Sequence, residues 1–254
     1  MDIHVDLVPD THAASHEQRG DAHVSVVVDV LRSATVAALL FECGARSVTL
    51  TSSLRAARSL AQATSALLVG ERNGVPPEGF NHGSSPSALR SVRIDDDRDV
   101  VLLATESPRA LVAARGTTWL AGLTNAVAVV DDVVARRPAA VRIVCAGDTG
   151  EPDLSDTIAA GLLVTLIDRA SRVAHGVDVT LSGAARFSLS VLRTTKDPLD
   201  GIWASAFGAV LRSVGLEEDL AIASAVASSD VASRVVAIDE VHGKPVVRLA
   251  QRGS

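Results

Sequence analysis

Acidic, basic and amide side chains follow apolar runs that are typical of buried strands. They are Asp29 and Arg32, Glu71 and Arg72, Thr105 and Glu106, Asn125, and Asp148, Asp153 and Asp156. Carboxylates such as Asp29, Glu71 and Asp156 are hard oxygen ligands of the kind that Mg²⁺ takes while keeping several waters. Guanidinium groups such as Arg32 and Arg72 match a phosphate or carboxylate with two parallel N–H bonds. Together these side chains suit the binding of an anionic phosphate ester.

A long polar segment over residues 70–87 follows one of these runs. Its sequence, GERNGVPPEGFNHGSSPS, holds four glycines and three prolines. Loops of this length are usually functional or disordered rather than simple connections. Glycine turns such as His82-Gly83-Ser84 can direct backbone N–H groups at phosphate oxygens. We therefore expect this loop to form part of a binding site.

Several function classes find no support in the sequence. There is no Walker A, GxSxG, CxxC or GxGxxG pattern, which disfavours the common nucleotide, serine-hydrolase and redox sites. A formal net charge of −6 and 2% aromatic residues disfavour nucleic-acid binding, which needs a basic face or stacking platforms. No apolar run reaches the roughly 18 residues of a membrane helix, and no secretory signal is visible. We expect a cytoplasmic protein in which Cys43 and Cys145 are buried, reduced thiols.

The apolar runs alternate with alanine-rich stretches of helical character, and this order favours an α/β fold. Strands are predicted over 24–28, 46–50, 66–70, 100–105, 118–121, 141–146, 177–181 and near 220–225, with a terminal hairpin of 234–239 and 245–249. Helices are predicted over 33–43, from 51–53 to about 63, from 107, and over 125–137, 156–170, 184–194 and 201–214, with N-caps at Ser107, Thr124 and Ser155.

We expect one domain over residues 1–254, with mainly parallel or mixed sheets layered by helices; a pairing of two similar α/β lobes stays open. Ligands of such folds bind beyond the carboxyl ends of the strands. If the sheet is parallel, the polar residues at the strand ends converge on one rim.

Four segments together resemble the 2-phosphosulfolactate phosphatase family. They are Asp29-Val30-Leu31-Arg32-Ser33-Ala34-Thr35; Gly70-Glu71-Arg72-Asn73-Gly74 with Glu78-Gly79-Phe80-Asn81-His82-Gly83-Ser84-Ser85-Pro86; Thr124-Asn125-Ala126; and Cys145-Ala146-Gly147 with Ser155-Asp156 and Ala160-Gly161. The second of these is the most specific. The likeness runs from about Val24 to Leu166, with a weaker echo over 215–220, where the pattern is G-x-x-x-D followed by an apolar residue.

This resemblance implies a Mg²⁺-dependent phosphatase with the α/β fold of that family, acting on the phosphate ester of a small 2-hydroxy acid. The family's named reaction converts 2-phosphosulfolactate to sulfolactate and phosphate. On the residue chemistry and this resemblance together, we expect Asp29, Arg32, Glu71 and Arg72 to act in catalysis, Asn81, His82, Ser84, Ser85, Thr105 and Asn125 to bind substrate, and Asp29, Glu71 and Asp156 to bind Mg²⁺.

The implied partner is a small anionic phosphate ester, with neither nucleic acid nor membrane. Self-association through the apolar, alanine-rich helices to a homo-oligomer stays open. So does the choice between a metal-bound water and an aspartate as the nucleophile.

Two departures from the family pattern bear on activity. The family's GNSP stands here as Gly83-Ser84-Ser85-Pro86, and its TTNGT as Ala104-Thr105-Glu106-Ser107-Pro108. If the second turn donates N–H groups to phosphate, Glu106 adds like charge beside an anion and Pro108 removes a donor. The alternative hypothesis is therefore a non-catalytic anion-binding or regulatory protein on the same scaffold.

Overall fold

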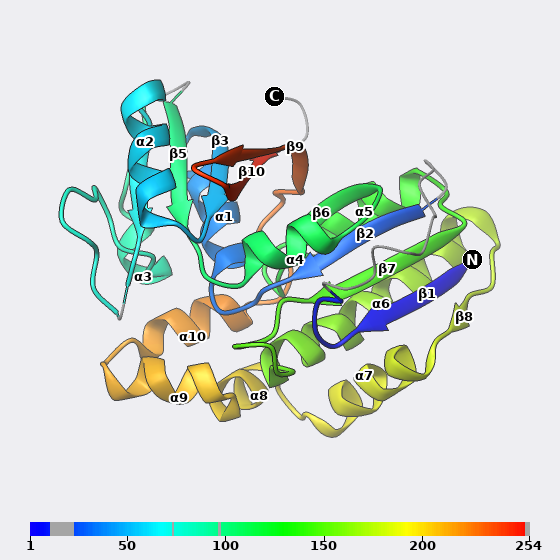
Figure 1. Ribbon diagram of the computed structural model, residues 1–254. Coiled ribbons are helices and arrows are strands. Elements are labelled where there is room, and N and C mark those ends of the chain that lie inside the picture. The colour runs from blue at the N-terminus through cyan, green and yellow to red at the C-terminus, as the bar shows by residue number, and fades with distance from the viewer. Residues whose placement is uncertain (11–22, 73, 96–97, 252–254) are drawn as a thin grey trace.

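The computed structural model describes residues 1–10, 23–72, 74–95 and 98–251. Within these residues one ten-stranded mixed sheet has the strand order β4-β5-β3-β10-β9-β6-β2-β7-β1-β8 (Figure 1). The strands are β1 Asp2–Asp6, β2 His23–Val28, β3 Ala45–Thr51, β4 Leu67–Gly70, β5 Arg98–Leu103, β6 Thr117–Ala121, β7 Ala140–Cys145, β8 Thr180–Leu181, β9 Ser233–Val241 and β10 Lys244–Ala250. The helices are α1 Ser33–Glu42, α2 Leu54–Thr64, α3 Pro86–Leu89, α4 Ser107–Ala113, α5 Ala126–Ala135, α6 Leu154–His175, α7 Gly183–Thr194, α8 Pro198–Ala204, α9 Ala206–Ser213 and α10 Glu217–Ser224. The predicted α/β class, with a mixed sheet and helical layers, is confirmed.

Two groups of parallel strands are joined by the C-terminal hairpin. β4, β5 and β3 are parallel to one another, and so are β6, β2, β7, β1 and β8. The hairpin β9–β10 lies between them, because β10 pairs antiparallel with β3 and β9 pairs antiparallel with β6. This hairpin forms where the sequence predicts it.

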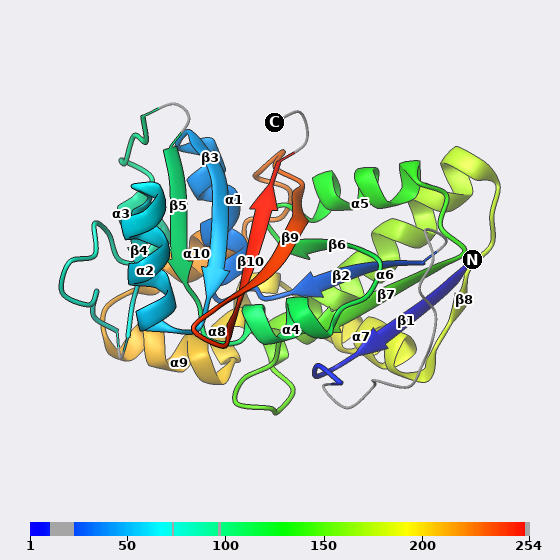
Figure 2. The ribbon, with the colours of Figure 1, turned by 45° about the horizontal axis from the view of Figure 1, so that its top comes forward.

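The polar strand ends come together for a different reason from the one expected. Three antiparallel pairings separate the two groups, so the groups run in opposite senses along the sheet. In Figure 2 the arrowheads of β3 and β5 point toward α8 and α9, and those of β2 and β6 point toward the middle of the molecule. The residues that follow β2, β4, β5 and β7 consequently line one cavity.

Two apolar cores hold this arrangement together. β2 is buried on both faces, with Val26 in one core and Val27 in the other. The first core packs under α5, α6 and α7, which contact β6, β7 and β1 respectively. The second core contains Leu50 of β3, Leu120 of β6 and Val247 of β10, so it joins the two groups of strands.

One predicted element is wrong and another is divided. Residues 217–224 form the helix α10 instead of the strand predicted near 220–225. Glu217 and Glu218 occupy its first turn, where carboxylates stabilise a helix. The predicted helix over 201–214 is divided into α8 and α9 at Ser205, whose hydroxyl accepts a hydrogen bond from the Gly208 N–H at 3.0 Å.

Three predicted N-caps are displaced by one or two residues. Asp153 rather than Ser155 caps α6, Asn125 rather than Thr124 begins α5, and Glu106 rather than Ser107 precedes α4. The cap predicted in the 51–53 segment is confirmed at Ser53, which accepts a hydrogen bond from the Ala56 N–H. Of these side chains, Asp153 lines the cavity described below, and Ser107 is buried behind it with its hydroxyl bonded to Asp29.

Two smaller expectations have mixed outcomes. The thiol of Cys145 is buried as expected, whereas Cys43 is partly exposed; both are free thiols. Among the described helices, none has the length and apolarity that a membrane crossing requires.

The crossing of α6 and α7 depends on Gly161, a residue of the Ala160-Gly161 motif. A Cβ at this position would lie 2.4 Å from the Ser188 carbonyl oxygen of α7. We expect Gly161→Ala to lower the free energy of unfolding by about 2 kcal/mol, because the two helices must separate. Urea denaturation measures this change. Gly183→Ala is the matched control, since no atom lies within 4 Å of its Cβ position; an equal loss in both variants would contradict the account.

Candidate active site

A cavity of about 420 Å³ lies where the carboxyl ends of β2, β4, β5 and β7 approach α9. Its polar lining comes from Asp29, Arg32, Ser33, Glu71, Ser84, Thr105, Glu106, Asp148, Thr149, Asp153, Ser155 and Asp156. Its apolar lining is described further below. Most of the predicted catalytic and metal-binding residues are therefore brought to one place.

Arg32 is the centre of a buried ion-pair network. Its Nη2 donates to Glu71 Oε2 at 2.8 Å and to Ser84 Oγ at 3.2 Å, while its Nη1 donates to Asp219 Oδ2 at 3.0 Å. The Arg32 side chain is only 8% exposed. Glu71 also accepts the Ser84 N–H at 3.0 Å, so one carboxylate fixes both the arginine and the loop. Buried charges of this kind need partners, and here they come from the loop over residues 70–87 and from α10.

Asp219 is a site residue that the sequence analysis did not assign. Its Oδ2 faces Arg32, and its Oδ1 accepts bonds from Ser85 Oγ at 2.7 Å, Ser87 N at 3.0 Å and Ser87 Oγ at 2.8 Å. The residue is fully buried. The sequence signal for Asp219 is the G-x-x-x-D pattern over residues 215–220, which is similar to the family pattern. The sequence predicts a strand there, whereas Asp219 lies on the helix α10.

Asp29 and Asp156 form a second, acidic part of the cavity. Asp29 Oδ1 accepts the Ser33 N–H at 3.2 Å, and its Oδ2 accepts the hydroxyls of Ser33 at 2.8 Å and of Ser107. Burial raises the pKa of Asp29, and these hydrogen bonds act in the opposite direction. Asp156 accepts the N–H groups of Val30 at 2.9 Å and Gly147 at 3.0 Å.

The carboxylates repel one another. Burial, and then the negative charges of Asp29 and Asp153, raise the pKa of Asp156 well above its usual range. Asp153 is itself buried and caps α6 by accepting the N–H of Ser155 at 2.8 Å. Such a cluster is strained electrostatically unless a proton or a cation joins it.

The donor set of this acidic part fits Mg²⁺. The ion is commonly bound by one or two carboxylates and keeps several waters. Asp29 and Asp156 supply two buried carboxylates of this kind, and a dication would relieve their repulsion. No cage of three or more histidine, cysteine or acidic side chains is present within the residues that the structure describes. Glu71, predicted as a third ligand, pairs with the Arg32 guanidinium at 2.8 Å, so a cation already balances its charge.

The loop residues predicted to bind substrate divide into two sets. Ser84 lines the cavity, and Ser85 supports Asp219 from beside it. Asn81 instead accepts the Leu68 N–H at 2.8 Å, and His82 forms a bridge with Val69, so both extend the edge of β4. Arg72, predicted as catalytic, is exposed and outside the cavity lining. Asn73 of the same motif lies outside the described residues.

Asn125 is not brought into the cavity. It is fully buried; its Oδ1 accepts the Gly122 N–H at 2.8 Å, and its Nδ2 donates to the carbonyls of Leu120 and Val231, each at 3.1 Å. These bonds tie the end of β6 to the segment before β9. The geometry indicates a structural role for this residue.

The turn that departs from the family pattern faces the cavity. Thr105 is exposed and Glu106 is partly buried at its lining. Burial raises the pKa of Glu106, while the charge of Arg109 acts in the opposite direction. Ser107 and Pro108 are buried, and the Ser107 hydroxyl donates to Asp29. The turn Glu106-Ser107-Pro108 therefore supplies a hydrogen-bond donor, Ser107, to the Asp29 carboxylate and adds the negative charge of Glu106.

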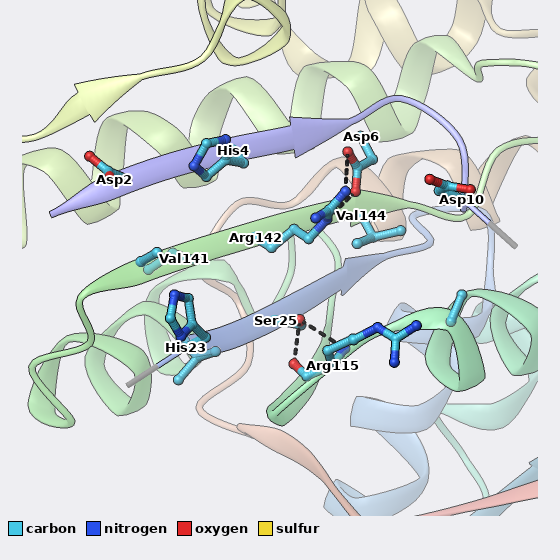
Figure 3. Close-up of a pocket in the computed structure, with 13 residues that line it drawn as sticks. Asp2, His4, Asp6, Asp10, His23, Ser25, Arg115, Val141, Arg142 and Val144 are labelled. Carbon is cyan, nitrogen blue, oxygen red and sulfur yellow. Dashed lines mark hydrogen bonds and ion pairs between the residues drawn. The ribbon is translucent and has the colours of Figure 1, made fainter. Parts of the chain in front are cut away.

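A second hollow of about 400 Å³ lies on the face of β1, β7 and β2 (Figure 3). Arg142 points along this face to Asp6, with Nη2 and Oδ1 3.1 Å apart, and Ser25 bonds to the backbone of Arg115. None of the predicted site residues lines it. We therefore assign the candidate active site to the first cavity.

Comparisons with known proteins match one family over most of the chain. A family model described as 2-phosphosulpholactate phosphatase matches residues 9–237. A Deinococcus radiodurans protein named "Probable 2-phosphosulfolactate phosphatase" is 33% identical over 246 residues, covering 95% of this chain and 96% of the relative. A Thermus thermophilus protein of the same name is 33% identical over 232 residues, covering 90% and 92%. A Synechococcus protein of that name is 39% identical over 144 residues, covering 55% and 59%.

Removal of one partner from the Arg32 network is expected to be costly. Asp219→Asn leaves a buried guanidinium with one carboxylate, so we expect the free energy of unfolding to fall by about 3 kcal/mol. Asp168→Asn is the matched control, because Asp168 pairs with Arg172 at 2.8 Å on an exposed face of α6; there the expected loss is under about 0.5 kcal/mol. Urea denaturation of both variants gives the comparison, and similar losses would contradict a special role for Asp219.

The acidic part of the cavity predicts an unusual pH dependence. A carboxyl whose pKa is raised by folding stabilises the fold below its unfolded pKa, and this contribution disappears as the pH rises through the folded pKa. Asp29→Asn is therefore expected to raise the thermal midpoint of the metal-free protein at pH 8, with a smaller gain toward pH 4. The hydroxyls of Ser33 and Ser107 can turn to accept the new amide.

Asp99→Asn serves as a control of opposite sign. Hydrogen bonding to Arg46 lowers the pKa of Asp99, so its contribution to stability is present above its unfolded pKa and lost in acid. This variant is expected to lose stability at pH 8 and to approach wild type at low pH. Curves of the same sign for the two variants would refute the assignment of Asp29 to a strained acidic cluster.

Proposed function

The chain belongs to the 2-phosphosulfolactate phosphatase family, and we propose that it hydrolyses the phosphate monoester of a small 2-hydroxy acid with the help of Mg²⁺. 2-Phosphosulfolactate, which the names of the relatives specify, is the reference substrate for this proposal. The observation that carries it is the juxtaposition of Arg32 with the Asp29–Asp156 pair in one cavity. One part offers a fixed cation, and the other offers hard oxygen ligands.

Arg32 would bind and orient the anionic ester. Its bonds to Glu71, Ser84 and Asp219 use three of its five N–H groups, and the other two have no partner among the described residues. The side chain is held from three directions, so little conformational entropy is lost when an anion binds. The Ser84 hydroxyl lies 3.2 Å from the guanidinium and can also donate to a phosphate oxygen.

Asp29 and Asp156 would hold Mg²⁺, which when bound supplies neutralisation of phosphoryl charge and lowers the pKa of water. Hydrolysis forms a bond from the attacking oxygen to phosphorus and breaks the ester P–O bond, so the departing alkoxide must gain a proton. A carboxylate that holds Mg²⁺ is deprotonated, so this proton would come from water and not from Asp29 or Asp156.

The second candidate function is anion binding without turnover. Glu106 favours it, because its carboxylate at the cavity lining repels a phosphate dianion. Its partial neutralisation by Arg109, at 3.1 Å, and the bond from Ser107 to Asp29 favour the catalytic proposal instead. A cytoplasmic location and a homo-oligomeric state stay predictions.

The test is phosphate release from 2-phosphosulfolactate and 2-phospholactate, with Mg²⁺ and after treatment with EDTA. We expect release that depends on Mg²⁺. Arg32→Lys should lower kcat/KM by about 10²-fold, because a lysine cannot reproduce the fixed fork and misplaces the substrate. Arg172→Lys, on the exposed face of α6, is the matched control and should leave kcat/KM unchanged.

Three results would count against the proposal in different ways. Release that persists in EDTA would exclude the role of Mg²⁺. Equal rates for Arg32→Lys and wild type would remove Arg32 from the site. Tight binding of an ester without any phosphate release would favour the anion-binding alternative.

A further inference from the structure

The apolar wall, as the term is used below, consists of Phe207, Val210 and Val214 of the α9 region. The full apolar lining of the candidate active site is Leu31, Val36, Leu102, Leu103, Ala104, Phe207, Val210, Leu211, Val214 and Leu216. Several of these belong to the sheet core, but Val210 and Val214 of the α9 region are 52% and 58% exposed. These two valines therefore present apolar surface that the fold itself does not bury.

The cavity offers few groups for a second strong acid on the substrate. Of its described lining residues, six carry carboxylates and Arg32 alone carries a basic side chain. The phosphate takes the N–H groups of Arg32 that Glu71, Ser84 and Asp219 leave unused, so no basic side chain of the described lining is left for a sulfonate. A sulfonate is a permanent anion that loses its hydration on binding, and without a cationic partner this is unfavourable.

Arg32 and the apolar residues of the α9 region line the same cavity, and their arrangement would orient a bound ligand. Phe207 lies at the boundary, with its ring centroid 5.9 Å from the Arg32 guanidinium carbon. A phosphate ester that faces Arg32 and the Asp29–Asp156 pair would extend its substituent toward Phe207, Val210 and Val214. An apolar substituent would cover these side chains, whereas a sulfonate would meet no donor on them.

We propose that the preferred substrate is a 2-hydroxy acid phosphate whose substituent is apolar, an alkyl or aryl group in place of a sulfonated one. This inference rests on the proposed phosphatase function and specifies its substrate class. Each methylene that the apolar wall buries should raise kcat/KM by about fourfold. Val210 and Val214 act as specificity-determining residues in this account.

The experiment compares kcat/KM for four esters at saturating Mg²⁺: 2-phosphosulfolactate, 2-phospholactate, 2-phospho-4-methylpentanoate and 2-phospho-3-phenyllactate. We expect the two esters with larger apolar substituents to exceed 2-phosphosulfolactate by at least about tenfold. A preference for 2-phosphosulfolactate, or equal rates on all four, would overturn the substrate class and leave the phosphatase function standing. No hydrolysis of any ester would overturn both.

Val210→Arg tests the wall directly, because it puts a cation where the account requires apolar surface. The expected result is a reversed order, with a fall for 2-phospho-4-methylpentanoate and a rise for 2-phosphosulfolactate. Val173→Arg is the matched control. Val173 is 82% exposed near the C-terminal end of α6, whereas the cavity lies at the N-terminal end of that helix. Val210→Leu should keep the wild-type order. An unchanged order in Val210→Arg would refute the assignment of the wall to substrate recognition.

Discussion

A buried guanidinium with two carboxylate partners is the constraint on which the rest of the site depends. Arg32 follows β2, Glu71 follows β4, and Asp219 lies on α10, so the network joins segments that are distant in the chain. Ion pairs of this kind contribute little net stability, because their desolvation cost is large. Their effect is on geometry: any displacement of the loop over residues 70–87, or of α10, would leave a buried charge unpaired. The network therefore fixes the relative positions of the two strand groups where they form the cavity.

The cavity combines three environments that perform different tasks. Around Arg32 the charges are compensated and the geometry is fixed. Around Asp29 and Asp156, burial and then the charges of neighbouring carboxylates raise the pKa of both carboxyls, and a divalent cation is a favourable addition there. Along α9 the surface is apolar. In the proposed substrate, the phosphate would face Arg32 and the Asp29–Asp156 pair, and the apolar substituent would face α9. This match relates the proposed activity to the particular side chains of this chain.

Much of the site could be predicted from the sequence because its residues follow apolar strands or belong to a specific motif. Asp29, Arg32, Glu71 and Asp156 all reach the cavity, although the sheet is not parallel throughout. Asn81 and His82 belong to the same motif but bond along the edge of β4, since sequence proximity does not reveal which loop residues complete a sheet edge.

Other features depend on packing that no local pattern contains. Asp219 was hidden because residues 217–224 were predicted as the wrong element, and its partners lie more than a hundred positions away. Val210 and Val214 have the sequence pattern of ordinary helix residues, and only the fold shows that they line a cavity. Asn125 follows a strand as a site residue would, yet its side chain bonds to the backbone of Gly122, Leu120 and Val231.

The central claim is that Asp29 and Asp156 hold a divalent cation beside an anion bound at Arg32. Crystals grown with Mn²⁺ and orthovanadate test it most directly, because the anomalous signal locates the metal without reference to any assumed site. The account predicts one strong anomalous peak within bonding distance of both carboxylates, with vanadate density between that peak and the Arg32 guanidinium. A peak confined to the face of β1, β7 and β2, or vanadate bound away from Arg32, would contradict it.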